Sequence, residues 1–429
     1  MDSGEVPPLP ESVFEEADSV ASETIRENIS LVKQDGEIEI STVPFMQFRG
    51  ANNNPVFKNL TCRDAIFDKE PLWKTSIPGE GVSSPIIVKD RVIVTSADGS
   101  GESRLHTAAY ALANGQKIWQ RTLKATGSLL CFRPFSSVAA NTPASDGKYV
   151  VALFSSNDLV CFTLEGDLVW YRALGVENPD VVVSVGLAAS PLIVDKTLVV
   201  QCQSNAASFA EAMDLSTGKT LWKIERPKGQ GWASPTPLTQ RNGSQSVVFV
   251  DRTGCTIHSL RTGEKLAGHE MKCGLTTSPV CIDDTVYFTA NGITALRFDA
   301  SSKSQEILWN QSSLTAGSPS LLVDGDNLYF IKSPGILQCV DRHSGDTIWQ
   351  TRLSGSFYAT PVIIGDHLIA LSQQGMMYHV LLNEAKGNKL EDTELGEEIL
   401  GSPALSERSV LIRSKKSLLR FDFASEELN

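Results

Sequence analysis

A hydroxyl residue followed by proline recurs along this chain of 429 residues, and eight of these dipeptides are spaced at intervals of 40 to 58 residues. The eight dipeptides are Ser84-Pro85, Thr142-Pro143, Ser190-Pro191, Ser234-Pro235, Ser278-Pro279, Ser318-Pro319, Thr360-Pro361 and Ser402-Pro403. Each opens an apolar run, a polar turn and a second apolar run, a pattern typical of strands covered on both faces. A period of this length suits four strands per unit. The sequence therefore predicts an all-β fold, an eight-bladed β-propeller of four-stranded antiparallel blades.

A second periodic feature is a turn ending in glycine, followed by a tryptophan. The tryptophans of this series are Trp73, Trp119, Trp170, Trp222, Trp309 and Trp349, with Leu266 and Leu390 in the same place in two repeats. Glycine supplies the positive φ of tight hairpins. The indole is a large apolar body with one N–H donor, so we expect it to wedge between neighbouring blades.

The two ends of the repeat array indicate how the ring closes. Trp73 precedes the first Ser-Pro, whereas only three strand-like runs follow Ser402-Pro403. We predict that residues 65–75 supply the missing outer strand of the last blade and pair with residues 410–423. Such an N-terminal strand completes the last blade and leaves the ring without an open end.

Charge divides the chain into a leader at residues 1–44 and a propeller at residues 45–429. The net charge is −12, and residues 1–40 alone hold eleven acidic and two basic residues. We expect this acidic leader to be mobile or loosely docked. The propeller is close to neutral and has no basic run, which argues against a nucleic-acid partner. No apolar run reaches eighteen residues, so we expect no membrane span. We also expect a monomeric propeller.

The motif Leu-Ser-Thr-Gly-Lys-Thr-Leu-Trp at Leu215–Trp222, joined to the next Ser-Pro strand, resembles the pyrroloquinoline-quinone (PQQ)-like repeat. The resemblance covers about residues 65–423. This family includes quinoprotein dehydrogenases and propeller lipoproteins of bacterial outer-membrane assembly. Residues 48–54 also resemble the N-terminal segment of secreted bacterial PQQ-like proteins. The resemblance implies a periplasmic or secreted bacterial setting, but a fold alone does not give a function.

The residues that PQQ chemistry would need are not evident. The family's dehydrogenases require cations for three carboxylates, a calcium ion with carboxylate ligands, an aspartate base and a disulfide between adjacent cysteines. This chain has no adjacent cysteines and no oxygen-rich calcium loop. Its six histidines lack metal-ligand spacing, and we expect those in turns, such as His343 and His367, to be solvated. We expect no catalytic residues, no metal and no cofactor, PQQ with calcium included.

The residues near each proline should surround the central channel. We expect the eight hydroxyls to bond backbone groups, with a polar ligand ring as the alternative. Three positions before the prolines, Trp232 and Tyr358 stand out among smaller residues. They could stack on a planar ligand or a peptide, or they could plug the channel.

The first repeat carries an insertion at residues 124–140 with the segment Cys131-Phe132-Arg133-Pro134-Phe135. We expect this loop to fold over the channel mouth with Phe132 and Phe135 buried; the alternative is a recognition loop with exposed aromatics. Asp251-Arg252 and Asp341-Arg342 are interpreted as surface ion pairs or parts of a binding face.

Cysteine usage is also informative. Cys161, Cys202, Cys281 and Cys339 lie in strand-like runs and are expected to be buried, whereas Cys62, Cys131 and Cys273 could pair in an oxidising compartment.

Two functional hypotheses follow. The first is a non-catalytic propeller scaffold that binds a protein or cell-envelope partner through its face loops. The alternative is a small-ligand or quinone-binding protein, including an oxidoreductase, with its site at the channel mouth. The candidate binding residues are Trp232, Tyr358, Arg133, Phe132 and Arg252.

Overall fold

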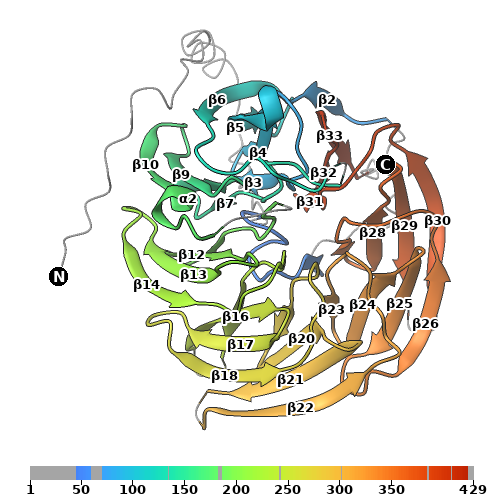
Figure 1. Ribbon diagram of the computed structural model, residues 1–429. Helices are drawn as coiled ribbons and strands as arrows, with labels where there is room; N and C mark the ends of the chain where they lie inside the picture. The colour runs from blue at the N-terminus through green and yellow to red at the C-terminus, as the bar shows by residue number, and fades with distance from the viewer. Residues whose placement is uncertain are drawn as a thin grey trace, which may run out of the picture.

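Eight sheets, each with four antiparallel strands, form a ring around a central channel (Figure 1), and one of them carries an additional short parallel strand. The computed structural model describes residues 45–58, 70–133, 135–181, 186–240, 243–300, 302–383, 386–406 and 408–423. The acidic leader and Cys62 lie outside these ranges. The predicted fold class, an eight-bladed propeller of four-stranded blades, is confirmed.

The strands of each blade follow one another from the channel outward. The first blade holds β3 (Ile86–Val88), β4 (Arg91–Asp98), β5 (Arg104–Ala111) and β6 (Lys117–Lys124), and the second holds β7 (Ala144–Ser145), β8 (Tyr149–Leu153), β9 (Asp158–Thr163) and β10 (Leu168–Ala173). The third holds β11 (Leu192–Val194), β12 (Thr197–Cys202), β13 (Phe209–Asp214) and β14 (Thr220–Glu225), and the fourth holds β15 (Thr236–Thr239), β16 (Gln245–Asp251), β17 (Gly254–Ser259) and β18 (Lys265–Glu270).

The remaining blades repeat this order. The fifth holds β19 (Val280–Ile282), β20 (Thr285–Thr289), β21 (Ile293–Asp299) and β22 (Ser304–Gln311), and the sixth holds β23 (Leu322–Asp324), β24 (Asn327–Lys332), β25 (Ile336–Asp341) and β26 (Thr347–Arg352). The seventh holds β27 (Val362–Ile364), β28 (His367–Leu371), β29 (Met376–Leu382) and β30 (Gly387–Glu394), with β1 (Val56–Phe57) parallel to β27. The eighth holds β31 (Ala404–Leu405), β32 (Ser409–Arg413), β33 (Ser417–Asp422) and β2 (Trp73–Ser76). Helical turns are limited to η2 (Ser100–Glu102) and α2 (Leu174–Glu177) within the described residues.

Tryptophans on the outer strands dock each blade onto the next. The Nε1 of Trp170 donates to the carbonyl oxygen of Leu215 over 2.9 Å, and its ring covers Gly218, where a Cβ would lie 2.7 Å from the indole. The same indole-to-carbonyl bond recurs for Trp73, Trp119, Trp222, Trp309 and Trp349. The turn glycine therefore has two functions, since it adopts a positive φ and also leaves space for the indole of the preceding blade.

Two predicted substitutes for this tryptophan were wrong. Leu390 is 43% exposed and does not wedge between blades. In the fourth blade, the strand position equivalent to that of Trp222 in the third blade is held by Ala267 rather than by Leu266. A register shift lies beside each tryptophan position, so the sequence alone leaves a one-residue uncertainty about which residue takes the place of the tryptophan.

Strands from the two ends of the repeat array meet in the eighth blade. The strand β2 pairs antiparallel with β33, from Trp73 opposite Arg420 to Ser76 opposite Ser417. Figure 1 shows the blue β2 beside the red β33. Residues 65–69 of the segment 65–75, which was assigned to this strand from sequence, lie outside the described residues. The described residues 73–76 hold the outer-strand position of the blade.

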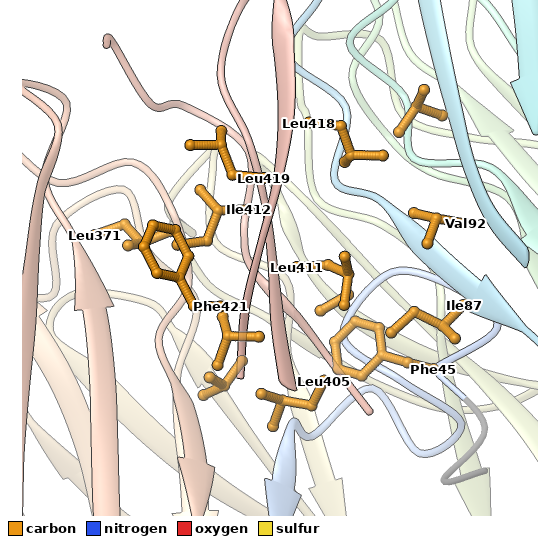
Figure 2. Packing of buried hydrophobic residues seen from close by; sticks show 14 of the residues in the cluster. Phe45, Ile87, Val92, Leu371, Leu405, Leu411, Ile412, Leu418, Leu419 and Phe421 are labelled. Carbon is orange, nitrogen blue, oxygen red and sulfur yellow. The ribbon is translucent and has the colours of Figure 1, made fainter. Parts of the chain in front are cut away.

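The core at this junction is continuous across three blades. Leu411 and Leu418 of the eighth blade belong to one buried cluster with Leu371 of the seventh and Ile87 of the first (Figure 2). Phe45, which precedes the first blade, joins the same cluster and is 1% exposed. Continuous burial of this kind stabilises a sheet stack by about 25 cal/mol for each Å² of apolar surface removed from water.

The segment from Phe45 to Lys58 crosses the channel and bonds to its innermost strands. Ile87, Ser145 and Ile363 each donate a backbone N–H to this segment, at the carbonyl oxygens of Phe45, Met46 and Pro55. Gln47 Oε1 and Asn54 Oδ1 accept from two further inner strands. Because these contacts reach five separate blades, the segment closes the channel from one side.

Candidate functional site: the channel cavity and its rim

A closed ring of hydroxyl groups lines the channel. In each blade, one residue donates its backbone N–H to the side-chain hydroxyl oxygen of the equivalent residue in the next blade, over 2.9–3.1 Å. The eight members of this hydroxyl ring, in order, are Ser84, Thr142, Ser190, Ser234, Ser278, Ser320, Thr360 and Ser402. The expectation that the repeated hydroxyls bond backbone groups is confirmed for seven of the eight. They bond the neighbouring blade, so the ring also links all eight blades.

One ring member differs from the sequence assignment. In the sixth blade the ring hydroxyl belongs to Ser320 rather than to Ser318 of the Ser318-Pro319 dipeptide. Ser318 instead occupies the wall position two residues earlier, where Ala316 was expected. The proline is a local signal, but the ring position is set by which hydroxyl meets the neighbour's N–H, and the sequence does not show that contact.

A cavity of about 390 Å³ lies above the hydroxyl ring. All eight ring hydroxyls line it, and Phe48 of the crossing segment joins them. The residues two positions before the hydroxyls form a second circle, the wall: Val82, Ala140, Ala188, Trp232, Thr276, Ser318, Tyr358 and Leu400. Among the described residues, no side chain that lines the cavity is ionisable at neutral pH.

Aromatic side chains of the insertion form the rim of this cavity. Phe135 stacks on Tyr358 of the seventh blade, with ring centroids 5.6 Å apart, and on Phe132 at 5.8 Å. Across the wall, the Nε1 of Trp232 donates to the carbonyl oxygen of Gly186 over 3.0 Å. The indole is thereby held in place, and its ring borders the cavity.

The insertion is anchored by two buried carboxylates. Glu102 accepts from Arg133 Nη1 at 2.7 Å, from Ser137 Oγ at 2.9 Å and from the backbone N–H of Val138 at 2.6 Å. Asp158, fully buried, accepts from the hydroxyl and the backbone N–H of Thr126. Charge-assisted bonds of this kind are about twice as strong as neutral ones, so both ends of the loop are fixed.

The exposure of the two phenylalanines differs from the expectation. Phe132 is 57% exposed and Phe135 is 36% exposed, so the prediction that both are buried was wrong. The loop does reach the channel mouth, because both rings line the cavity. Leu130 of the same loop is 57% exposed. A fixed loop here presents three large apolar side chains to solvent.

The two candidate arginines lie away from the cavity. Arg133 pairs with Glu102 and borders a separate polar hollow with Lys415. Arg252 is exposed on the turn between β16 and β17, and neighbouring Asp251 forms a buried ion pair with Arg226 at 2.8 Å instead. The interpretation of Asp251-Arg252 as a surface ion pair was therefore wrong. Trp232, Tyr358 and Phe132 are brought together at the cavity, and their role in binding stays a prediction.

Two buried arginines lie behind the hydroxyl ring, and no sequence pattern predicted the burial of either. Arg49 donates to the carbonyl oxygens of Pro279 at 2.9 Å and Leu321 at 2.8 Å. Arg413 donates to Ser83 O and Thr95 O, both at 3.0 Å. Neither pairs with a carboxylate among the described residues, and burial lowers the pKa of each to about 9.

A histidine pair was also missed. His367 Nδ1 lies 2.6 Å from His379 Nε2, and both rings are buried, so the prediction that His367 is solvated was wrong. Burial, together with His367, lowers the pKa of His379 to about 4. The two residues are twelve positions apart and meet only because β28 pairs with β29.

The cysteines behave as small apolar side chains. Cys161, Cys202, Cys281 and Cys339 are buried as predicted. These four, and also Cys131, Cys255 and Cys273, are free thiols. The described residues contain no cluster of three potential metal ligands. They also contain no helix with the length and apolarity to cross a membrane.

Solved structures share the architecture at low sequence identity. BamB from Moraxella catarrhalis aligns with a TM-score of 0.62 and 15% identity, covering 85% of this chain and 100% of that one. A europium-containing methanol dehydrogenase aligns with a TM-score of 0.69 and 10% identity, covering 93% and 100%. Quinohemoprotein alcohol dehydrogenase from Comamonas testosteroni gives 0.67 and 10%, covering 89% and 80%. At these identities the likeness concerns the fold alone.

Sequence comparison identifies a curated relative and a family. The outer membrane protein assembly factor BamB of Legionella pneumophila (strain Paris) is 28% identical over 221 residues. That alignment spans 49% of this chain and about half, 48%, of the relative. The family described as outer membrane protein assembly factor BamB matches residues 57–265, 108–351 and 212–427 in overlapping segments. Because these segments together cover most of the chain, the protein belongs to the BamB family of β-propellers.

Proposed function

We propose that this protein is a non-catalytic scaffold that binds a protein partner of the bacterial cell envelope through the rim of its channel. The observation that carries the proposal is the exposure of Leu130, Phe132 and Phe135 on a loop fixed by Glu102 and Asp158. Clustered apolar side chains on a soluble protein usually mark an interaction site. A fixed loop loses little conformational entropy when a partner binds.

Family membership supports the cellular setting of this proposal. The relatives are named for outer membrane protein assembly. A periplasmic or secreted location and a monomeric propeller are parts of the same proposal. The rim also has the composition of a binding centre, because aromatic side chains are enriched at the energetically dominant positions of interfaces.

The alternative, a PQQ enzyme, is supported only by the shared fold of the dehydrogenases. PQQ carries three carboxylates, and its dehydrogenases hold calcium with further carboxylates. The described lining of the cavity offers neither cations nor carboxylates for these groups. We therefore propose that PQQ with calcium does not fit this site. Absorbance and thermal-shift titrations with PQQ and calcium test this point, and saturable binding would overturn it.

The scaffold proposal is tested by quantitative purification from envelope extracts. The affinity-tagged full chain is compared with Leu130→Ser/Phe132→Ser and with Leu221→Ser/Ile348→Ser, which changes two similarly exposed residues on outer strands. We expect one protein to be enriched equally by the parent chain and the outer-strand variant, and to be depleted at least about tenfold by the loop variant, a loss of about 1.4 kcal/mol. Equal recovery with both variants would contradict the proposal.

A further inference from the structure

The channel cavity is mainly apolar at its wall and rim and polar at its floor, and partner binding at the rim does not require this difference. Its wall and rim are mainly apolar, with Trp232, Tyr358 and Phe135 as the largest side chains. Its floor is the hydroxyl ring. A volume of about 390 Å³ lies within the usual range of small-molecule sites, about 300–1,000 Å³.

The hydroxyl ring provides unused hydrogen-bond donors. Each ring oxygen accepts one backbone N–H from a neighbouring blade. A hydroxyl has one proton to donate as well. Within the described part of the chain, none of the eight hydroxyls donates to a protein acceptor. Their protons are therefore available to acceptor atoms inside the cavity.

The charges around the floor favour an anion. Arg49 bonds the carbonyl oxygens of Ser278 and Pro279, one of which belongs to a ring residue. Arg413 bonds the oxygen of Ser83, directly beside ring member Ser84. Both arginines are 1% exposed and have no carboxylate partner among the described residues. Neither guanidinium lines the cavity, but each bonds a carbonyl oxygen in or directly beside the ring, and a positive charge without a counter-ion favours an anion nearby.

We infer that the cavity binds a small monoanion with an apolar body, such as an aryl or alkyl carboxylate. The anionic head contacts the hydroxyl ring, and the apolar body packs between Trp232 and the Phe135–Tyr358 pair. A neutral ligand of the same shape gains the apolar contacts but not the charge-assisted hydrogen bonds. This site shares Phe135 with the proposed partner-binding rim, but the two proposals rest on different observations, and either can fail without the other.

The inference is tested by calorimetric titration of the full chain with naphthalene-2-carboxylate and with the matched neutral amide, naphthalene-2-carboxamide. The carboxylate is expected to bind at least about tenfold more tightly than the amide. Ala188→Phe and Ser318→Leu each enlarge a wall side chain and fill the cavity from a different blade. Either variant, if folded by circular dichroism, should weaken carboxylate binding at least about tenfold.

Leu221→Phe is the matched control, because it enlarges an exposed residue on β14, away from the cavity lining. It is expected to leave carboxylate binding unchanged. Equal affinity for carboxylate and amide would overturn the role of the hydroxyl ring. No binding of the carboxylate at millimolar concentration, or unchanged binding by both cavity-filling variants, would overturn the site itself.

Discussion

Ser402 in the last blade donates its backbone N–H to Ser84 Oγ in the first blade over 3.0 Å. The same contact joins each of the remaining seven pairs of neighbouring blades, so the hydroxyl ring closes without interruption. The junction between the last blade and the first is thus equivalent, at the channel, to the seven junctions between blades that are consecutive in the sequence.

Replacing Ser84 with alanine tests this equivalence. The change leaves the buried N–H of Ser402 without an acceptor, which costs about 1–3 kcal/mol. We expect Ser84→Ala and the internal variant Ser190→Ala to lower the free energy of unfolding by similar amounts in urea denaturation. Ser84→Thr should be close to neutral, because Thr142 and Thr360 already serve in the ring. A loss as large for threonine as for alanine would show that the hydroxyl is not the cause.

The contact between Gly218 and Trp170 predicts a second stability effect. Alanine at Gly218 requires a positive φ of 68° and places its Cβ 2.7 Å from the indole. Gly396 has a similar φ of 70°, but no atom lies within 4 Å of the place that an alanine methyl would take there. Gly396→Ala should therefore cost only the backbone strain, about 1–2 kcal/mol, and Gly218→Ala should cost more. Equal losses in thermal unfolding would mean that the indole yields freely.

The buried carboxylate of Glu102 predicts a local effect on the insertion. Glu102→Gln removes the charge that binds Arg133 and the N–H of Val138. We expect amide hydrogen exchange to accelerate at residues 128–138, because the loop loses its charge-assisted anchor. Exchange in the distant β24 should not change. An unchanged exchange rate at Val138 would show that Asp158 and the aromatic stack are sufficient to hold the loop.

The histidine pair predicts a pH dependence. Because burial lowers the pKa of His379 to about 4, the unfolded chain binds a proton between pH 6.5 and 4 that the folded chain does not. The free energy of unfolding therefore falls as the pH drops through this window, by about 3 kcal/mol for this one group. Urea denaturation at pH 7 and pH 4.5 should show a smaller loss for His379→Gln than for the parent chain. Parallel losses in the two proteins would contradict the assignment.

The sequence predicted the fold because its signals are local and repeated. Apolar runs, turn glycines and the Ser/Thr-Pro dipeptides recur in each blade, so one misassigned repeat, such as Ser318, does not change the blade count. The tryptophans were correctly identified as wedges for the same reason. Leu390 was misassigned because a register shift, which depends on the neighbouring strand, decides which residue faces the next blade.

The candidate site was predicted only in part. Trp232 and Tyr358 were found because they are large residues at a small-residue position of the repeat, and both line the cavity. Arg133 was assigned to the cavity because it lies next to Phe132 in the sequence, but its orientation depends on Glu102, which lies on a different hairpin. Arg49 and Arg413 were missed because nothing local distinguishes an arginine that bonds only carbonyl oxygens in the core.

The partner-binding rim is tested most directly by a photo-crosslinking amino acid placed at Phe132 or, as the control, at Leu221. These positions are 57% and 54% exposed, so solvent access is matched. In intact cells of the source organism, the account predicts one dominant protein adduct at position 132 and none at position 221. No adduct at position 132, or the same adducts at both positions, would contradict it.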